Sequence, residues 1–318
     1  MYLSKITLEY YSLIISDGTI LTIDRDTSGS SSIYTLHGDD RVNLVSSGLV
    51  YLGAGDDYLT MSYTGSYESG RAYGGDGSDT IIGGQHDDDI QGNGGSDTIE
   101  GGAGDDTLLG DCYVNYPVFC YGPDYDYYGS QEIGAADIIK GGDGNDLIVG
   151  GLGADELWGG TGSDTFIYEH PEGFGDTIYD FEAGTTGDLI YLNHLFDAAA
   201  VERDEFEDLV RFTQSGSDVF LEVDLDGSGA ATDFVSVTTL KNTSVTALSN
   251  EHLVGFSANT LHEIDYYQVA SFFDDELTID RDTSGYFTYT LHGNDRVNLV
   301  ASGLVYLGAG DDYLTMSY

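Results

Sequence analysis

Seven aspartates between residues 74 and 167 occupy the same place in a nine-residue phrase, Gly-Gly-x-Gly-x-Asp-x-apolar-x. A carboxylate and the carbonyl oxygens of a glycine-rich turn are hard oxygen ligands, and Ca²⁺ takes about six to eight of these in proteins. One turn has too few oxygens, so we expect each ion to lie between two stacked turns. The predicted carboxylate ligands are Asp79, Asp88, Asp97, Asp106, Asp146, Asp155 and Asp164.

The glycines of the phrase explain how backbone carbonyls would reach an ion. Glycine adopts positive φ readily and has no Cβ, so the chain can turn tightly with its carbonyl oxygens pointing inward. Two copies depart from the pattern, because His86 and Asn93 each replace one glycine. Asn93 is the milder change, since asparagine tolerates positive φ. The complete copies are residues 74–82, 101–109, 141–149, 150–158 and 159–167.

The eighth place of the phrase predicts the fold. Its residue is apolar in every copy, and an apolar residue in a short strand can stack on its neighbours in a thin core. Two phrases would form one coil with a metal-binding turn on each side, which is typical of a calcium-binding parallel β-helix. A flexible Gly/Asp-rich linker is the alternative, but a linker would not keep this spacing. The inward residues are Ile81, Ile90, Ile99, Leu108, Ile148, Leu157 and Phe166.

The composition also favours divalent cations as partners. The 318 residues include 56 Asp and Glu but only 10 Lys and Arg, a formal charge of −46. Such a chain repels itself without counter-ions, and it is a poor partner for nucleic acid or an anionic membrane. No apolar run is long enough for a membrane span. Because Glu9 lies where a Sec-type signal peptide needs an apolar stretch, we expect no such signal.

The sequence predicts an all-β protein of four regions. Residues 1–63 are a divergent strand-rich segment that ends in an incomplete phrase, and a linker over 63–73 leads to the parallel β-roll at 74–167. A mainly antiparallel β domain is expected over 176–256. Residues 262–318 are a partial repeat of the first region, because 277–318 nearly repeats 21–63.

An insert at 110–133 interrupts the roll and contains both cysteines of the chain, Cys112 and Cys120, among several tyrosines. In an oxidising compartment the two thiols could close a small loop, and we expect this disulfide; in the cytosol they would be free. The tyrosines could bind a sugar or a protein surface, or they could cover the roll locally.

On the phrases in 74–167 the chain resembles the RTX family, the haemolysin-type calcium-binding repeat proteins of Gram-negative bacteria. Stretches in 176–181, 223–229 and 235–240 resemble the segment that follows such rolls in substrates of type I secretion. The resemblance implies that calcium is held by the sixth-place Asp and by the carbonyls of places two and four. It thereby implicates Gly75, Gly77, Gly95, Gly102, Gly104, Gly142, Gly144, Gly151, Gly153, Gly160 and Gly162, and the divergent phrase adds Asp57.

The resemblance also implies where the protein works. The acid-rich roll would stay unfolded at cytosolic calcium, pass through type I secretion machinery, and fold on binding several Ca²⁺ ions outside the cell. We therefore expect an extracellular protein.

The sequence indicates no enzyme. It contains neither the His-Glu-x-x-His of zinc proteases nor the Gly-x-Ser-x-Gly of lipases, and its seven histidines are scattered singly. The leading hypothesis is a calcium-folded structural or adhesive module. Two alternatives stay open: the non-catalytic secretion and folding portion of an RTX exoenzyme or toxin, and carbohydrate binding through the tyrosine-rich insert.

Overall fold

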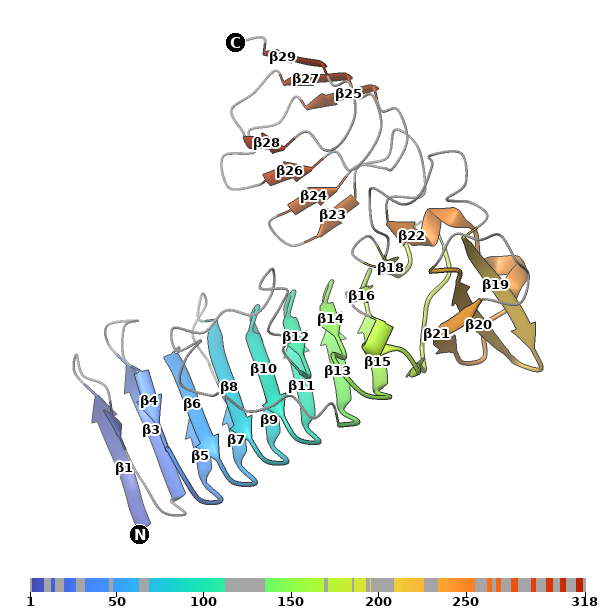
Figure 1. Ribbon diagram of the computed structural model, residues 1–318. Coiled ribbons are helices and arrows are strands. Elements are labelled where there is room, and N and C mark those ends of the chain that lie inside the picture. Colours follow the sequence, from blue (N-terminus) through green and yellow to red (C-terminus); the bar gives the residue numbers. More distant parts are fainter. Residues whose placement is uncertain are drawn as a thin grey trace.

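The computed structural model shows an all-β parallel solenoid of about 10 turns (Figure 1). This confirms the predicted fold class for the repeat region. The structure describes residues 2–8, 13–14, 20–26, 32–45, 48–62, 69–111, 135–168, 171–184, 186–192, 195, 209–225, 234–254, 262–264, 267–269, 276–279, 287–289, 296–299, 304–306 and 313–316. The predicted disulfide between Cys112 and Cys120 and the tyrosines of the insert lie outside these residues.

The chain alternates between two long sheets, so that successive strands belong to opposite faces of the solenoid. Sheet A consists, in spatial order, of β1 (Tyr2–Leu8), β3 (Ile20–Asp26), β5 (Arg41–Leu44), β7 (Tyr58–Met61), β9 (Thr80–Ile82), β11 (Thr98–Ala103), β13 (Ile138–Asp143), β15 (Glu156–Thr161), β17 (Asp176–Ile178), β21 (Val235–Leu240), β20 (Asp218–Val223) and β19 (Val210–Ser215). All its pairings from β1 to β21 are parallel.

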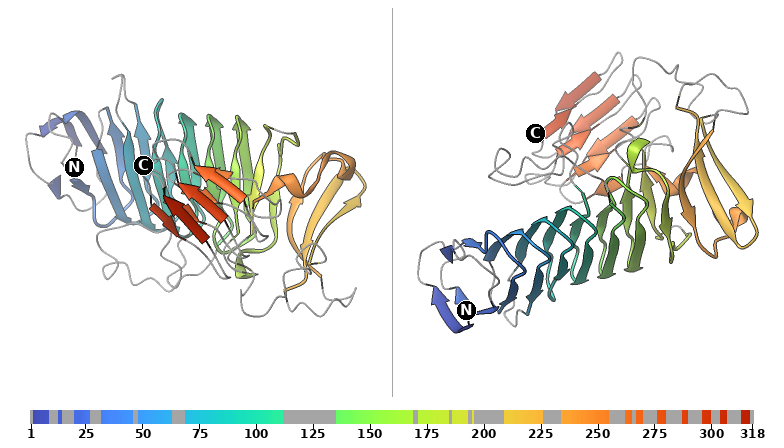
Figure 2. Two further views of the ribbon diagram at one scale, coloured as in Figure 1. Left: turned by 90° about the horizontal axis from the view of Figure 1, so that it is seen from above. Right: turned by 60° about the horizontal axis from the view of Figure 1, so that its bottom comes forward.

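Sheet B forms the facing layer, and all its pairings are parallel. It consists of β2 (Leu13–Ile14), β4 (Ser32–Tyr34), β6 (Gly48–Ala54), β8 (Gly70–Asp76), β10 (Asp89–Gly94), β12 (Thr107–Leu109), β14 (Leu147–Val149), β16 (Thr165–Ile167), β18 (Leu189–Tyr191) and β22 (Leu253–Val254). The rungs of the two sheets stack along one axis, as the two further views show (Figure 2).

The core lies between the sheets and is built from the eighth place of each phrase. Register keeps these residues in columns: Ile81 pairs with Ile99 in sheet A, and Ile90 pairs with Leu108 in sheet B. All seven predicted inward residues are at most 1% exposed. Burying an aliphatic side chain of this size contributes about 1.5–3 kcal/mol, so the columns hold neighbouring coils together.

The solenoid extends beyond the predicted array at both ends. Residues 70–73, expected in a linker, form the first half of β8, which pairs with β6 and so joins the N-terminal coils to the repeats. After the array, β17 pairs with β15 and β18 pairs with β16. The reason is that Asp176-Thr-Ile178 and Asp188-Leu-Ile190 preserve the acid-x-apolar end of the phrase.

The predicted mainly antiparallel domain at 176–256 is not confirmed. Among the described residues of this region, the antiparallel pairings are those of β19 with β20 and of β20 with β21, and β21 continues sheet A through its parallel pairing with β17. Short 3-10 turns η1 (Pro171–Gly173), η4 (Val245–Ala247) and η5 (Asn250–His252) complete this part. Among the described residues, no helix is long and apolar enough to span a membrane.

The duplicated C-terminal sequence folds into coils of the same register as its first copy. One sheet contains β23 (His262–Ile264), β24 (Tyr267–Val269), β26 (Phe287–Tyr289) and β28 (Leu304–Tyr306); the other contains β25 (Glu276–Ile279), β27 (Arg296–Leu299) and β29 (Tyr313–Met316). The pairing of Arg41 with Tyr58 recurs between Arg296 and Tyr313. Equal sequences therefore select equal strand pairings here.

Candidate metal centre

The turns between the sheets form two edges of the solenoid, and each edge has a column of aspartates. The first edge comprises the turns that lead from sheet B to sheet A. It contains Asp57, Asp79, Asp97, Asp137, Asp155 and Asp176. The second edge comprises the turns that lead from sheet A to sheet B. It contains Asp88, Asp106, Asp146, Asp164 and Asp188. The structure thus brings the predicted carboxylate ligands together in two groups.

In each column one carboxylate oxygen links adjacent coils. Asp97 Oδ1 accepts the backbone N–H of Asp79 at 2.8 Å, and the two residues are 18 apart in the sequence. The same bond joins the pairs Asp57–Asp79, Asp97–Asp137, Asp137–Asp155, Asp155–Asp176, Asp88–Asp106, Asp106–Asp146, Asp146–Asp164 and Asp164–Asp188, at 2.7–3.0 Å. Sixth-place aspartates therefore help to hold adjacent coils together in register.

The other carboxylate oxygen is buried and has no hydrogen-bond partner among the described residues in eight of these side chains. The eight are Asp57, Asp79, Asp97, Asp106, Asp137, Asp146, Asp155 and Asp164. All are at most 3% exposed. Burying a charged group without a partner is costly, so buried charges are paired or bind metal ions. The Oδ2 atoms are thus the part of each turn where a cation could pair with the carboxylate.

The first glycine of the phrase leaves space for this oxygen. A Cβ added to Gly74 would collide with Asp79 Oδ2, and one added to Gly101 would collide with Asp106 Oδ2. The same contact recurs at Gly92, Gly110, Gly141, Gly150 and Gly159. The first place therefore requires glycine because the carboxylate lies against its Cα.

The glycines predicted as carbonyl ligands adopt the backbone that a tight turn requires. All eleven have φ between +98° and +143°, and Asn93 adopts +74° in the same place. A Cβ at Gly75 or Gly142 would also meet a carbonyl oxygen of the preceding coil. Their positive φ and close coil contacts explain why glycine recurs at places two and four.

The turn that contains His86 is different. Neither Gly84 nor His86 is among the described residues with positive φ, and Asp88 Oδ2 accepts the backbone N–H of Gly84 at 2.7 Å. The carboxylate that would face an ion is thus satisfied within its own turn. Asp88 lies in the second-edge column, but its turn lacks the arrangement shared by the others.

Column residues that were not predicted from the sequence include Asp137, Asp176 and Asp188. Each precedes an inward apolar residue by two places, namely Ile139, Ile178 and Ile190, all 0% exposed. That acid-x-apolar spacing is the signal that could have identified them. Asp176 and Asp155 lie face to face, since a Cβ at Gly150 would contact Oδ2 of both.

Burial raises the pKa of the column carboxylates from the ordinary 3.8. The pKa of Asp97 rises to about 6, those of Asp79 and Asp106 to about 8, and that of Asp137 to about 9. Desolvation is the largest cause; except at Asp97, neighbouring carboxylates add to it, while a backbone hydrogen bond opposes it in all four. A bound cation would favour the charged form and remove this penalty.

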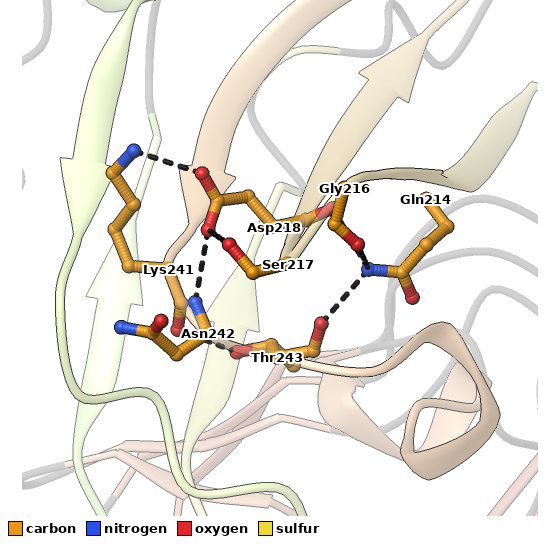
Figure 3. Close-up of polar contacts among 7 residues, drawn as sticks. All are labelled: Gln214, Gly216, Ser217, Asp218, Lys241, Asn242 and Thr243. Atoms are coloured by element: carbon orange, nitrogen blue, oxygen red, sulfur yellow. Dashed lines mark hydrogen bonds and ion pairs between the residues drawn. The ribbon is translucent and has the colours of Figure 1, made fainter.

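Asp218 provides a contrast in the same chain (Figure 3). At the turn beside β20, its carboxylate accepts hydrogen bonds from Lys241 Nζ at 2.9 Å, from the backbone N–H of Asn242 at 3.1 Å and from Ser217 Oγ at 2.9 Å. These partners lower the pKa of Asp218 to about 2, with the Lys241 contact as the main cause. This carboxylate is charge-paired and needs no metal.

The donor set fits calcium better than a transition metal. In the described part of the chain, no three His, Cys, Asp or Glu side chains gather into one cluster that could hold a metal. Ligands would therefore be one carboxylate per turn together with glycine carbonyls, an all-oxygen set. Zinc sites use imidazole and thiolate ligands, whereas calcium accepts carboxylate and carbonyl oxygens.

Comparison with known proteins agrees with this geometry. The repeat family described as RTX calcium-binding nonapeptide repeat (4 copies) matches residues 65–99, 73–108 and 134–166. No curated protein sequence matches the chain.

Two solved structures are similar over part of the chain. The AlgE6R3 subunit of the Azotobacter vinelandii mannuronan C5-epimerase is 26% identical, with 54% of this chain and 78% of that chain covered and a TM-score of 0.28. The AlgE6R2 subunit of the same enzyme is 23% identical, with 54% and 90% covered and a TM-score of 0.28.

Proposed function

Residues 65–108 and 134–166 are RTX calcium-binding nonapeptide repeats, and on this premise we propose that the solenoid folds by binding several calcium ions along its two edges. Each ion lies between successive turns and is bound by the sixth-place carboxylates and by the carbonyls of places two and four. The observation that carries the proposal is the row of buried Oδ2 atoms without a partner, such as those of Asp79 and Asp106.

In this proposal, calcium binding strongly stabilises the folded roll. A site that exists only in the folded state contributes about 2.7 kcal/mol when calcium is at about a hundredfold excess over Kd. Without the metal, the roll must bury several carboxylates in a chain of formal charge −46. Several filled sites offset the cost of burying the carboxylates and the repulsion within the acidic chain. The roll is therefore folded in millimolar calcium and unfolded in a chelator.

The proposed calcium-dependent folding takes place outside the cell. We propose that the protein is secreted, reaches type I export machinery in its unfolded, calcium-free form, and serves as a non-catalytic structural or adhesive module. The charge and the calcium repeats support this role, because both make the folded state depend on a calcium-rich medium.

The test measures folding and binding together. Far-UV circular dichroism of the full chain should show β structure in 2 mM calcium (a concentration of about the extracellular order) and largely lose it in EDTA. Isothermal titration calorimetry should give several ions per chain. Magnesium at the same concentration is the control, since it demands a smaller octahedral site and retains its waters. A spectrum that is identical in calcium and in EDTA contradicts the proposal.

A further inference from the structure

The insert interrupts a phrase at its third place instead of lying between two phrases. Gly110 holds the first place, because a Cβ there would collide with Asp137 Oδ2 just as one at Gly74 collides with Asp79 Oδ2. In the next coil, Gly151 stacks on Asp111 and Gly153 stacks on Ala135. Asp111 is therefore at place two and Ala135 at place four, and residues 112–134 replace place three.

This split turn retains its place in the first-edge column. Asp137 Oδ1 accepts the N–H of Asp97 at 2.7 Å, and the N–H of Asp137 donates to Asp155 Oδ1 at 2.8 Å. Ile139 packs in the core at 0% exposure. The coil is thus continuous across the insert, and its ends are held by the same contacts as those of an uninterrupted turn.

The split turn has one carboxylate more than a regular turn. Asp111 occupies the place of a glycine and is 3% exposed, while Asp137 is 1% exposed. Asp137 Oδ2 is buried and has no hydrogen-bond partner among the described residues, which independently favours a cation at this oxygen. The turns on either side add Asp97 and Asp155, so this stretch of the edge has a high density of buried negative charge.

We propose that the split turn is a calcium site with Asp111 and Asp137 as carboxylate ligands, and that the ion there ties together the two ends of the insert. The inference rests on the proposed calcium-dependent folding and adds Asp111, which lies outside the matched residues, as a ligand. Asp111 lies on the N-terminal side of the insert and Asp137 on the C-terminal side. An ion shared by both residues closes the loop, so calcium controls the position from which the insert leaves the roll.

The first test counts ions by equilibrium dialysis of the full chain with ⁴⁵Ca²⁺. Asp111→Asn and Asp137→Asn each keep the shape of the side chain but remove its charge, and each is expected to bind about one ion fewer than the wild type or to bind that ion at least tenfold more weakly. Asp218→Asn is the control and should bind as the wild type does, because that carboxylate pairs with Lys241. Unchanged binding in Asp111→Asn overturns the assignment of Asp111.

The second test measures the alkylation rate of a cysteine at the N-terminal end of the insert. Both cysteines of the chain, Cys112 and Cys120, lie in it, and Cys112 directly follows Asp111. In reduced protein, calcium should slow alkylation of Cys112 several-fold in the wild type and in Asp146→Asn, which changes a second-edge turn, but not in Asp111→Asn. Equal calcium protection in Asp111→Asn and the wild type overturns the proposed tie.

The outcomes separate the two proposals. A wild type that binds no calcium refutes calcium-dependent folding itself. A wild type that binds calcium while both split-turn variants bind as many ions, equally tightly, refutes only the split site. Circular dichroism in saturating calcium checks that each variant is folded. If Asp137→Asn fails to fold, Asp111→Asn decides, because Asp111 lies at place two of the phrase, whereas the Oδ1 bonds to Asp97 and Asp155 involve Asp137 at place six.

Discussion

Asp137 Oδ1 accepts the backbone N–H of Asp97 at 2.7 Å, although the two residues are 40 apart in the sequence. Elsewhere on this edge the corresponding partners Asp79 and Asp97 are 18 apart. The column of hydrogen-bonded aspartates therefore continues without a break across the insert. A solenoid tolerates such an insertion because each coil contacts only its neighbours, so added residues need not disturb the pairing of the coils on either side.

Removing one column carboxylate should weaken both calcium binding and folding. We expect Asp106→Asn to bind about one ion fewer and to lower the free energy of unfolding in saturating calcium by about 2–3 kcal/mol, the contribution of one well-filled site. Urea denaturation in 2 mM and 10 mM calcium (about the extracellular order and above it) measures the change. Asp218→Asn is the control outside the column, and a loss of equal size there would show that the effect is not specific to the column.

The first glycine of a phrase should not tolerate alanine. In Gly101→Ala the new Cβ collides with Asp106 Oδ2 and with the carbonyl oxygen of Gly141, so we expect a loss of about 1–3 kcal/mol from overpacking and a higher calcium midpoint. Gly184→Ala is the matched control, because a Cβ there meets nothing within 4 Å. Calcium titrations followed by circular dichroism compare the two; equal midpoints would contradict the steric role of Gly101.

The turn with the histidine offers a gain-of-function test. His86→Gly restores the fourth-place glycine, which lets the turn adopt positive φ and frees Asp88 Oδ2 from the N–H of Gly84. We expect about one ion more than in the wild type, or a calcium midpoint lowered several-fold. His86→Ala is the control, since it removes the imidazole without providing access to positive φ. If both variants behave as the wild type, the backbone of this turn is not what limits its binding.

The pH dependence should reverse when calcium is added. The folded-state pKa values of Asp79 and Asp106, about 8, lie above the ordinary 3.8. A carboxylate with a raised folded-state pKa favours folding fully below its unfolded-state pKa, and this contribution is lost as the pH rises through the folded-state value. In EDTA, the β content should therefore increase as the pH falls from about 9 to about 5.

When calcium is present, lowering the pH should instead disfavour folding, because protons then compete with the metal for the same oxygens. The calcium midpoint should rise as the pH falls through the range of these pKa values, about 8 to 6. Circular dichroism at fixed pH with and without calcium measures both trends. A metal-free chain whose β content does not change between these pH values would contradict the burial of protonatable carboxylates.

Much of the local architecture was predictable, because the phrase acts within nine residues. The eleven glycines chosen as carbonyl ligands all adopt positive φ, and the seven inward apolar residues are all buried. The boundaries were less predictable: β8 begins inside the expected linker, and β17 and β18 continue the roll where a separate antiparallel domain was expected. β17 and β18 keep only the acid-x-apolar end of the phrase and follow turns without its full glycine pattern, so their place in the roll is clear from their pairing.

The sequence by itself determined the shape of each turn, since the glycines at places two and four act on their own backbone and the carboxylate of place six lies against the first glycine of the same phrase. Only the tertiary structure decided which aspartates share an edge, that Asp137 completes a phrase begun at Gly110, and that Asp88 is satisfied by Gly84. The physical reason is that a metal site here lies between coils. Its ligands are brought together by the register of parallel strands, and that register depends on core packing along the whole solenoid.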